Sequence, residues 1–204
     1  MNSLTDKYTL INSVEVPCIA FGTWKMPEEI AANAVKCAIE SGYRHIDTAA
    51  AYQNEEYVGK GIRESGVKRD EIFLVSKLPN DDHGYQNAID SCERSLKRLK
   101  TDYLDSYLIH WPVLVENVDR LEDDLCETWR AFEKLYNDGK LRSIGTSNFL
   151  EEHIEIIKRN FSTYPMINQV QMHPQNPQEE MIAYCKENKI LPEAFTSLIL
   201  LILS

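Results

Sequence analysis

The chain has 204 residues, of which 43% are hydrophobic and 26% are charged, a composition typical of a globular protein with one sizeable core. Its formal net charge of -10 opposes binding to nucleic-acid phosphates or anionic lipid, so neither nucleic acid nor a membrane is expected as a partner. The longest apolar run, residues 198–203, is far too short to span a bilayer, which leaves a small molecule as the expected ligand.

Cysteine usage and the N-terminus exclude further classes. The 5 cysteines are far apart and form no Cys-x-x-Cys pair, so we expect neither a disulfide framework nor a metal site. The first eight residues lack the apolar core and cleavage site of a signal peptide, which favours a cytoplasmic location. No shift in composition marks a boundary, and we expect residues 1–204 to form a single domain.

After a predicted hairpin at residues 8–17, short apolar runs alternate with helical patterns. The predicted strands are residues 19–22, 43–48, 72–78, 103–111, 141–146, 166–172 and 190–195. The six helices expected between them comprise one from Pro27 to Gly42, residues 54–64, one carrying Ile89, Cys92, Leu96 and Leu99, one carrying Trp129, Phe132, Leu135 and Tyr136 and ending at Gly139, residues 151–160 and residues 178–188.

Seven strands that alternate with six helices indicate parallel strands joined by crossover helices. Two architectures satisfy this pattern, the open doubly wound sheet and the (β/α)8 barrel. A doubly wound dinucleotide domain carries Gly-x-Gly-x-x-Gly after its first strand, whereas residues 21–27 contain one glycine. The sequence therefore favours a (β/α)8 TIM-barrel type of α/β fold, incomplete at about seven strands.

Polar residues that close apolar strands are the candidates for catalysis, because TIM-barrel active sites lie at the carboxyl ends of the strands. Asp47 ends the second strand, Tyr52 follows it, Lys77 ends the third strand and His110 ends the fourth. Each has a plain structural alternative: a helix cap for Asp47, surface packing for Tyr52, a solvated Lys77 and a core histidine at 110.

Together these four side chains suit carbonyl reduction. A tyrosine with a reference pKa of about 10 is a weak proton donor unless a cation lowers that pKa, and Lys77 is predicted to be this cation. Asp47 would hold the ammonium group, and a neutral His110 would donate a hydrogen bond to the carbonyl oxygen. The hydride must come from a cofactor, because no protein side chain supplies one.

Six segments between residues 21 and 174 resemble the signature segments of the aldo-keto reductase family, in the family's order. They also resemble its bacterial-type members that act on glyoxal or 2,5-diketo-gluconate. The segments are Phe-Gly-Thr-Trp (21–24), Ile-Asp-Thr-Ala-Ala-Ala-Tyr-Gln-Asn-Glu-Glu (46–56), Ser-Lys-Leu (76–78), Tyr-Leu-Ile-His-Trp-Pro (107–112), Ile-Gly-Thr-Ser-Asn-Phe (144–149) and Asn-Gln-Val-Gln-Met-His-Pro (168–174).

The resemblance implies an oxidoreductase of the alcohol dehydrogenase (NADP+) type, with NADPH (NADP+) as cofactor and a small carbonyl compound as substrate. Tyr52 would be the proton donor, tuned by Lys77 and Asp47, and His110 would orient the carbonyl. The cofactor-binding residues that it implies are Gly22, Thr23, Asp47, Ser147, Asn148, Gln169 and Phe195. The substrate-binding residues that it implies are Trp24, His110 and Trp111; core packing is the alternative for the two tryptophans.

The C-terminal part departs from the family pattern. The segment Glu-Ala-Phe-Thr-Ser-Leu (193–198) only approximates the family's aromatic and Ser-Pro-Leu segment, and Pro192 lies inside a predicted central strand, where it would remove a ladder donor. The family continues through an eighth strand and a basic segment that binds the adenosine phosphate. We therefore expect an interrupted reading frame near Leu191, open sheet edges and an aggregation-prone apolar tail at residues 199–204.

Three functional hypotheses follow. The first is an NADPH-dependent reductase of small aldehydes, ketones or diketo sugar acids, expected to be a monomer at full length. The second is a non-catalytic regulatory or binding subunit of the same family, which would not require the four polar residues. The third is an inactive truncated remnant that inherited the motifs. Residual NADPH affinity would separate the first from the third.

Overall fold

A seven-stranded parallel sheet organises the protein. The computed structural model describes residues 6–112 and 120–196. The strands follow one another in chain order across the sheet, and every neighbouring pair is parallel. They are β3 (Ala20–Gly22), β4 (His45–Asp47), β5 (Phe73–Leu78), β6 (Ser106–Ile109), β7 (Ile144–Ser147), β8 (Ile167–Gln171) and β9 (Leu191–Phe195).

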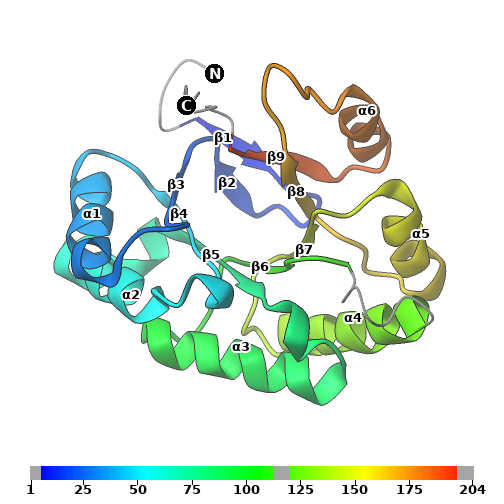
Figure 1. The fold of residues 1–204 in the computed structure, drawn as a ribbon, viewed down its shortest axis with the longest axis horizontal. Helices are drawn as coiled ribbons and strands as arrows, with labels where there is room; N and C mark the ends of the chain where they lie inside the picture. The colour runs from blue at the N-terminus through cyan, green and yellow to red at the C-terminus, as the bar shows by residue number, and fades with distance from the viewer. Residues whose placement is uncertain (1–5, 113–119, 197–204) are drawn as a thin grey trace, which may run out of the picture.

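Six α-helices connect these strands and lie around the outside of the sheet (Figure 1). They are α1 (Glu28–Glu40), α2 (Glu55–Glu64), α3 (Tyr85–Leu99), α4 (Leu121–Asn137), α5 (Glu151–Asn160) and α6 (Glu179–Glu187). The described part of the chain also has three short 3-10 helices between its strands and helices: η1 (Ala50–Tyr52), η2 (Arg69–Glu71) and η3 (Asn80–Asp82). The sheet curls into a parallel half-barrel, which confirms the α/β fold expected for an incomplete (β/α)8 barrel.

Burial explains why the sequence forms this layered arrangement. All six residues of β5 are buried, as expected for a parallel strand covered on both faces. Helix α3 turns one face inward, with Ala88, Cys92, Leu96 and Leu99 buried at helical spacing. The apolar side chains of strands and helices form one core cluster, which holds the carboxyl ends of the strands in place.

A hairpin closes the opposite, amino-terminal end of the sheet. Strands β1 (Lys7–Thr9) and β2 (Glu15–Pro17) pair antiparallel, as predicted for residues 8–17. Leu10 and Val16 are buried in the core cluster. The Asn12 side chain donates a 2.8 Å hydrogen bond to the Arg142 carbonyl, just before β7. This end is therefore a floor, and the carboxyl ends of the strands remain available for a site.

The predicted strands are present, and several are shorter than expected. The strand predicted at residues 103–111 is reduced to β6, with an isolated bridge from Leu104 to Leu141. The Leu74 amide donates to the Asp105 side chain at 3.0 Å, in place of a backbone carbonyl. Two arginines also bond this carboxylate. The Asp105 amide still donates to the Leu74 carbonyl at 3.0 Å, so the side chain takes over one of the two ladder bonds at this point.

Strand β9 accommodates Pro192 without the expected conflict. The Leu191 amide donates to the Met166 carbonyl on the β8 side at 2.9 Å, so the next nitrogen in an extended strand points away from β8. The proline therefore removes no donor from the β8–β9 ladder. On its other side β9 is an edge of the described sheet, so no ladder bond is lost there either.

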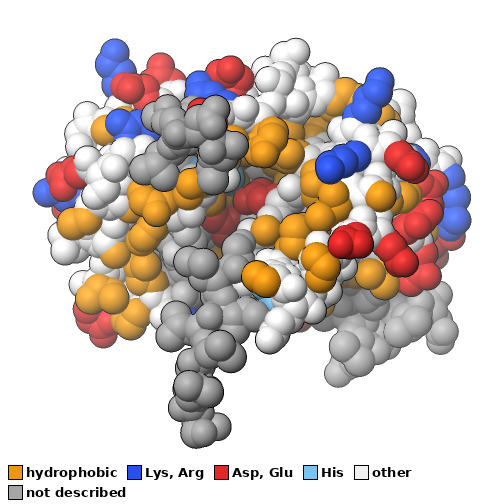
Figure 2. Space-filling model, turned by 90° about the horizontal axis from the view of Figure 1, so that it is seen from above, with side chains coloured by type: hydrophobic (Ala, Val, Ile, Leu, Met, Phe, Trp, Pro, Cys, Tyr) orange, Lys and Arg blue, Asp and Glu red, His pale blue; other side chains and the backbone are white. Residues whose placement is uncertain are grey.

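Figure 2 shows hydrophobic side chains on either side of a hollow in one face of the molecule. The predicted apolar tail, residues 199–204, lies outside the described residues.

The close approach of β7 to its neighbours predicts a sensitive glycine. A Cβ at Gly145 would lie 2.5 Å from the Ile167 carbonyl oxygen and 2.8 Å from Leu108 Cδ2, whereas a Cβ at Gly22 meets nothing within 4 Å. We expect Gly145→Ala to lower the free energy of unfolding by about 1–3 kcal/mol, as overpacking does, and Gly22→Ala to lower it by less. Urea denaturation of both variants checks this, and equal losses would contradict the packing argument.

Candidate active site

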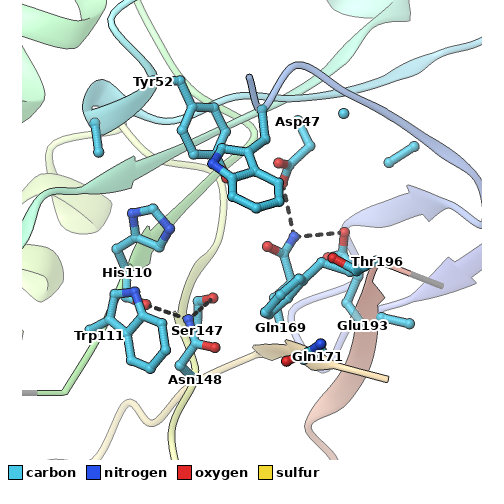
Figure 3. A pocket seen from close by; sticks show the side chains of 16 residues that line it. Asp47, Tyr52, His110, Trp111, Ser147, Asn148, Gln169, Gln171, Glu193 and Thr196 are labelled. Atoms are coloured by element: carbon cyan, nitrogen blue, oxygen red, sulfur yellow. Dashed lines mark hydrogen bonds between the residues drawn. The ribbon is translucent and has the colours of Figure 1, made fainter. Parts of the chain in front are cut away.

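A cleft at the carboxyl ends of the strands contains most of the predicted site residues. Its volume is about 700 Å³, and Figure 3 shows the labelled side chains around it. Ala20, Gly22, Trp24, Asp47, Ala51, Tyr52, His110, Trp111, Ser147, Asn148, Gln169, Gln171, Glu193, Ala194, Phe195 and Thr196 line it. Residues from across the chain thus meet where a TIM-type barrel carries its active site.

A buried ion pair forms the base of this cleft. Lys77, at 1% exposure, donates a 2.6 Å hydrogen bond to Asp47 Oδ1 and a 3.1 Å hydrogen bond to the Thr48 carbonyl. Burial alone would lower the pKa of the Lys77 ammonium, but the charge of Asp47, and that of Tyr52 once its phenol ionises, outweigh burial and raise that pKa. The lysine therefore stays charged, as the sequence predicted, and it is not solvated.

The Tyr52 hydroxyl lies beside this cation. The 3-10 helix η1 places Tyr52 Oη 3.5 Å from Lys77 Nζ, and the ring packs edge-on against His110 with centroids 5.8 Å apart. Burial raises the pKa of Tyr52, Lys77 lowers it, Asp47 raises it, and the net direction is upward. The expectation that Lys77 lowers this pKa is correct for its own contribution and wrong for the sum, because burial is the larger effect.

The His110 imidazole is neutral at physiological pH. Burial lowers its pKa to about 4, and the Lys77 charge acts in the same direction. A neutral imidazole keeps one N–H donor, as the sequence-based interpretation required.

Thr23 takes a different place from the other predicted cofactor residues. Its side chain is fully buried, and its hydroxyl and amide both bond the Asp47 carbonyl, at 3.1 and 3.0 Å. Asn54 then donates to the Thr23 carbonyl at 2.9 Å. Thr23 does not line the cleft; it holds the loop after β3 against the end of β4.

The wall of the cleft opposite Tyr52 carries side-chain amides and a hydroxyl group. Asn148 has a positive φ of 60 degrees, and its side chain donates to the His110 carbonyl at 2.9 Å and to Ser147 Oγ at 3.1 Å. Gln169 Nε2 donates to Asp47 Oδ2 at 2.9 Å and to Glu193 Oε1 at 3.1 Å. Asp47 therefore joins both walls, through one carboxylate oxygen each.

Aromatic side chains surround the mouth. Trp24 and Trp111 are 59% and 47% exposed, so core packing does not explain them, and Phe195 lines the cleft from β9. Within residues 6–112 and 120–196 no group of three or more His, Cys, Asp or Glu side chains is arranged to hold a metal ion. In the same residues no helix is long and apolar enough to cross a membrane.

Sequence reasoning missed three polar residues of the cleft, Glu193, Gln171 and Thr196. Glu193 carried a usable signal, since a carboxylate in the middle of a predicted buried strand needs a partner. His45, the first residue of β4, also approaches Glu193, with Nε2 3.8 Å from Glu193 Oε1.

A family comparison decides what this geometry belongs to. The sequence model of the Aldo/keto reductase family matches residues 18–198. This chain belongs to the aldo/keto reductase family. The resemblance drawn from the six segments is confirmed, and with it the assignment to an oxidoreductase family.

Individual aldo/keto reductases support the same assignment. A glyoxal reductase from Bacillus subtilis is 49% identical over 197 residues, which covers 96% of this chain and 68% of the relative. An aldo/keto reductase structure from Brucella melitensis superposes with a TM-score of 0.89 at 41% identity, over 94% of this chain and 72% of that one. An aldo-keto reductase of Bombyx mori, solved in complex with NADP, gives a TM-score of 0.87 at 36% identity, over 95% and 67%.

The depressed pKa of His110 predicts an acid sensitivity of folding. Its pKa falls from 6.5 to about 4 on folding, so the unfolded chain binds more protons in between, and stability is lost as the pH falls through this window. We expect His110→Gln, which cannot take up this proton, to lose less stability between pH 7 and pH 4.5 than the unaltered chain. Urea midpoints at both pH values measure the difference, and parallel losses would show that His110 does not titrate in this way.

Proposed function

We propose that this chain is an NADPH-dependent oxidoreductase that reduces small aldehydes or ketones to alcohols, with Tyr52 as proton donor. The observation that carries the proposal is the contact between the Tyr52 hydroxyl and Lys77 at 3.5 Å, with Lys77 held by Asp47 at the base of the cleft. A regulatory or binding subunit has no need of a buried ammonium beside a phenol.

The cleft fits the nicotinamide end of the cofactor. A carboxamide offers two N–H donors and one carbonyl acceptor, and this wall offers a Ser147 hydroxyl, the Asn148 side-chain carbonyl and the Gln169 side-chain carbonyl. Phe195 supplies an aromatic ring in the same cleft. We propose that these residues, with Gly22 and Asp47, hold the nicotinamide and its ribose, and that Thr23 acts by holding the Asp47 backbone.

The cofactor, when bound, supplies the hydride that the carbonyl carbon accepts. The protein's part is then the proton. Tyr52 is protonated at neutral pH, since the ordinary phenol pKa lies well above 7 and burial raises the pKa of Tyr52 further. It therefore carries the proton that the carbonyl oxygen takes up as negative charge develops there. Lys77 stabilises the phenolate that remains, and Asp47 prevents the ammonium from moving away.

His110 orients the substrate in this proposal. Its neutral ring packs against Tyr52 and can direct one N–H toward the same carbonyl oxygen, which sets the angle of proton transfer. Trp24 and Trp111 would contact the remainder of a small substrate at the mouth of the cleft. The relative named glyoxal reductase supports a short dicarbonyl compound, and methylglyoxal is the test substrate of choice.

Removal of one hydroxyl tests the proposal. We expect Tyr52→Phe to lower the rate of NADPH oxidation with methylglyoxal by about 10²- to 10⁴-fold, the usual contribution of a general acid. NADPH affinity, followed by quenching of tryptophan fluorescence, should change little. The measurement is the initial rate at the nicotinamide absorbance.

Tyr57→Phe is the matched control, because it removes a phenolic hydroxyl from the neighbouring helix α2, outside the cleft. Its rate should equal that of the unaltered chain. Full activity of Tyr52→Phe would remove Tyr52 from the mechanism. An unaltered chain that neither binds nor oxidises NADPH would refute the proposed function and favour an inactive form of the enzyme.

A further inference from the structure

The amide of Gln169 lies between two carboxylates, and this determines which end faces the cleft. Its Nε2 donates to Asp47 Oδ2 at 2.9 Å and to Glu193 Oε1 at 3.1 Å, which uses both of its N–H groups. A flipped amide would place its carbonyl oxygen against two carboxylate oxygens. The network therefore assigns the orientation, and Figure 3 shows the Gln169 oxygen turned away from both carboxylates.

Glu193 reaches this position from the edge strand. Gln169 and Glu193 are register partners on β8 and β9, and the Glu193 side chain is 15% exposed. The other charged or titratable groups that face it are His45, Asp47 and Lys77, from β4 and β5. Asp47 accepts from Lys77 as well as from Gln169, and Glu193 is the second acceptor for the amide.

The acceptor function of Glu193 does not depend on its protonation state. Burial raises the pKa of its carboxyl group. Oε2 is buried and has no hydrogen-bond partner among the described residues, so a proton held on Oε2 leaves Oε1 free to accept from Gln169. The orientation of the amide is therefore preserved across the neutral pH range.

We propose that Glu193 is a positioning residue that holds the Gln169 carbonyl oxygen toward the cleft, and that it thereby selects a carboxamide over a carboxylate on the bound ring. This inference rests on the proposed function, because it concerns the nicotinamide end of the same cleft. A carboxamide donates an N–H to the Gln169 oxygen, whereas a carboxylate has no donor and is repelled. An amide released from Glu193 can rotate and offer Nε2 to a carboxylate instead.

Two dinucleotides that differ only in this group provide the test. NADP+ and its nicotinic acid counterpart are titrated against tryptophan fluorescence, and the ratio of their dissociation constants is the readout. Glu193→Met removes the acceptor in a side chain of similar length, and Glu193→Gln removes the charge but retains a carbonyl acceptor. We expect the preference for NADP+ to fall about ten-fold in Glu193→Met, by loss of the hydrogen bond from Gln169 to Glu193 Oε1, and to stay within about three-fold in Glu193→Gln.

Each other result contradicts the inference. An equal loss of preference in both variants would show that the charge alone is responsible. An unchanged ratio in Glu193→Met, even with weaker binding of both ligands, would show a purely structural role. If Glu193→Met does not fold, Gln169→Met must show the same loss of preference, and retention of the preference there would overturn the inference. Failure of the unaltered chain to bind NADP+ would refute the proposed function as well, whereas normal binding with an unchanged ratio refutes this inference alone.

Discussion

The buried ion pair between Lys77 and Asp47 is the constraint on which the rest of the site depends. An ammonium group at 1% exposure would carry a large desolvation cost without a partner, and removal of one member of such a pair typically costs about 3–5 kcal/mol. The pair joins the ends of β4 and β5, and its two charges act on the polar side chains around it. Tyr52, His110 and Gln169 each take their position or their electrostatics from this pair.

Asp47 divides its two oxygens between two tasks. Oδ1 accepts a hydrogen bond from Lys77, on the side of the cleft with Tyr52. Oδ2 accepts a hydrogen bond from Gln169, on the side where we propose that the cofactor binds. Low local dielectric strengthens both bonds and penalises any unpaired member. The two walls are therefore one network, in which a change at Gln169 reaches the proposed proton donor through a single carboxylate. Thr23 bonds the backbone carbonyl of Asp47, and Asn54 bonds the Thr23 carbonyl, so both hold the backbone that carries this carboxylate.

The fold explains why so much of the site lies in this chain. In parallel α/β barrels the functional side chains come from the ends of successive strands. Six of the seven strands from β3 to β9, all except β5, carry a cleft residue at or just after their carboxyl end. The chain covers 68% of the Bacillus subtilis glyoxal reductase. Within it the four candidate catalytic residues and the groups suited to a nicotinamide are assembled around one cleft. No Lys or Arg lines that cleft among the described residues, which is consistent with our proposal that it takes the nicotinamide end of the cofactor rather than a phosphate.

By itself the sequence determined the order of strands and helices, the parallel barrel architecture, the family and the four polar residues at strand ends, because periodicity and local motifs are properties of neighbouring residues. Only the tertiary structure decided that Thr23 turns inward, that burial outweighs Lys77 in setting the Tyr52 pKa, and that Glu193 completes the environment of Gln169. The Asp47–Gln169 bond joins residues 122 positions apart. Such a contact depends on the curl of the sheet, and burial depends on everything packed around it, so neither is visible in a local pattern.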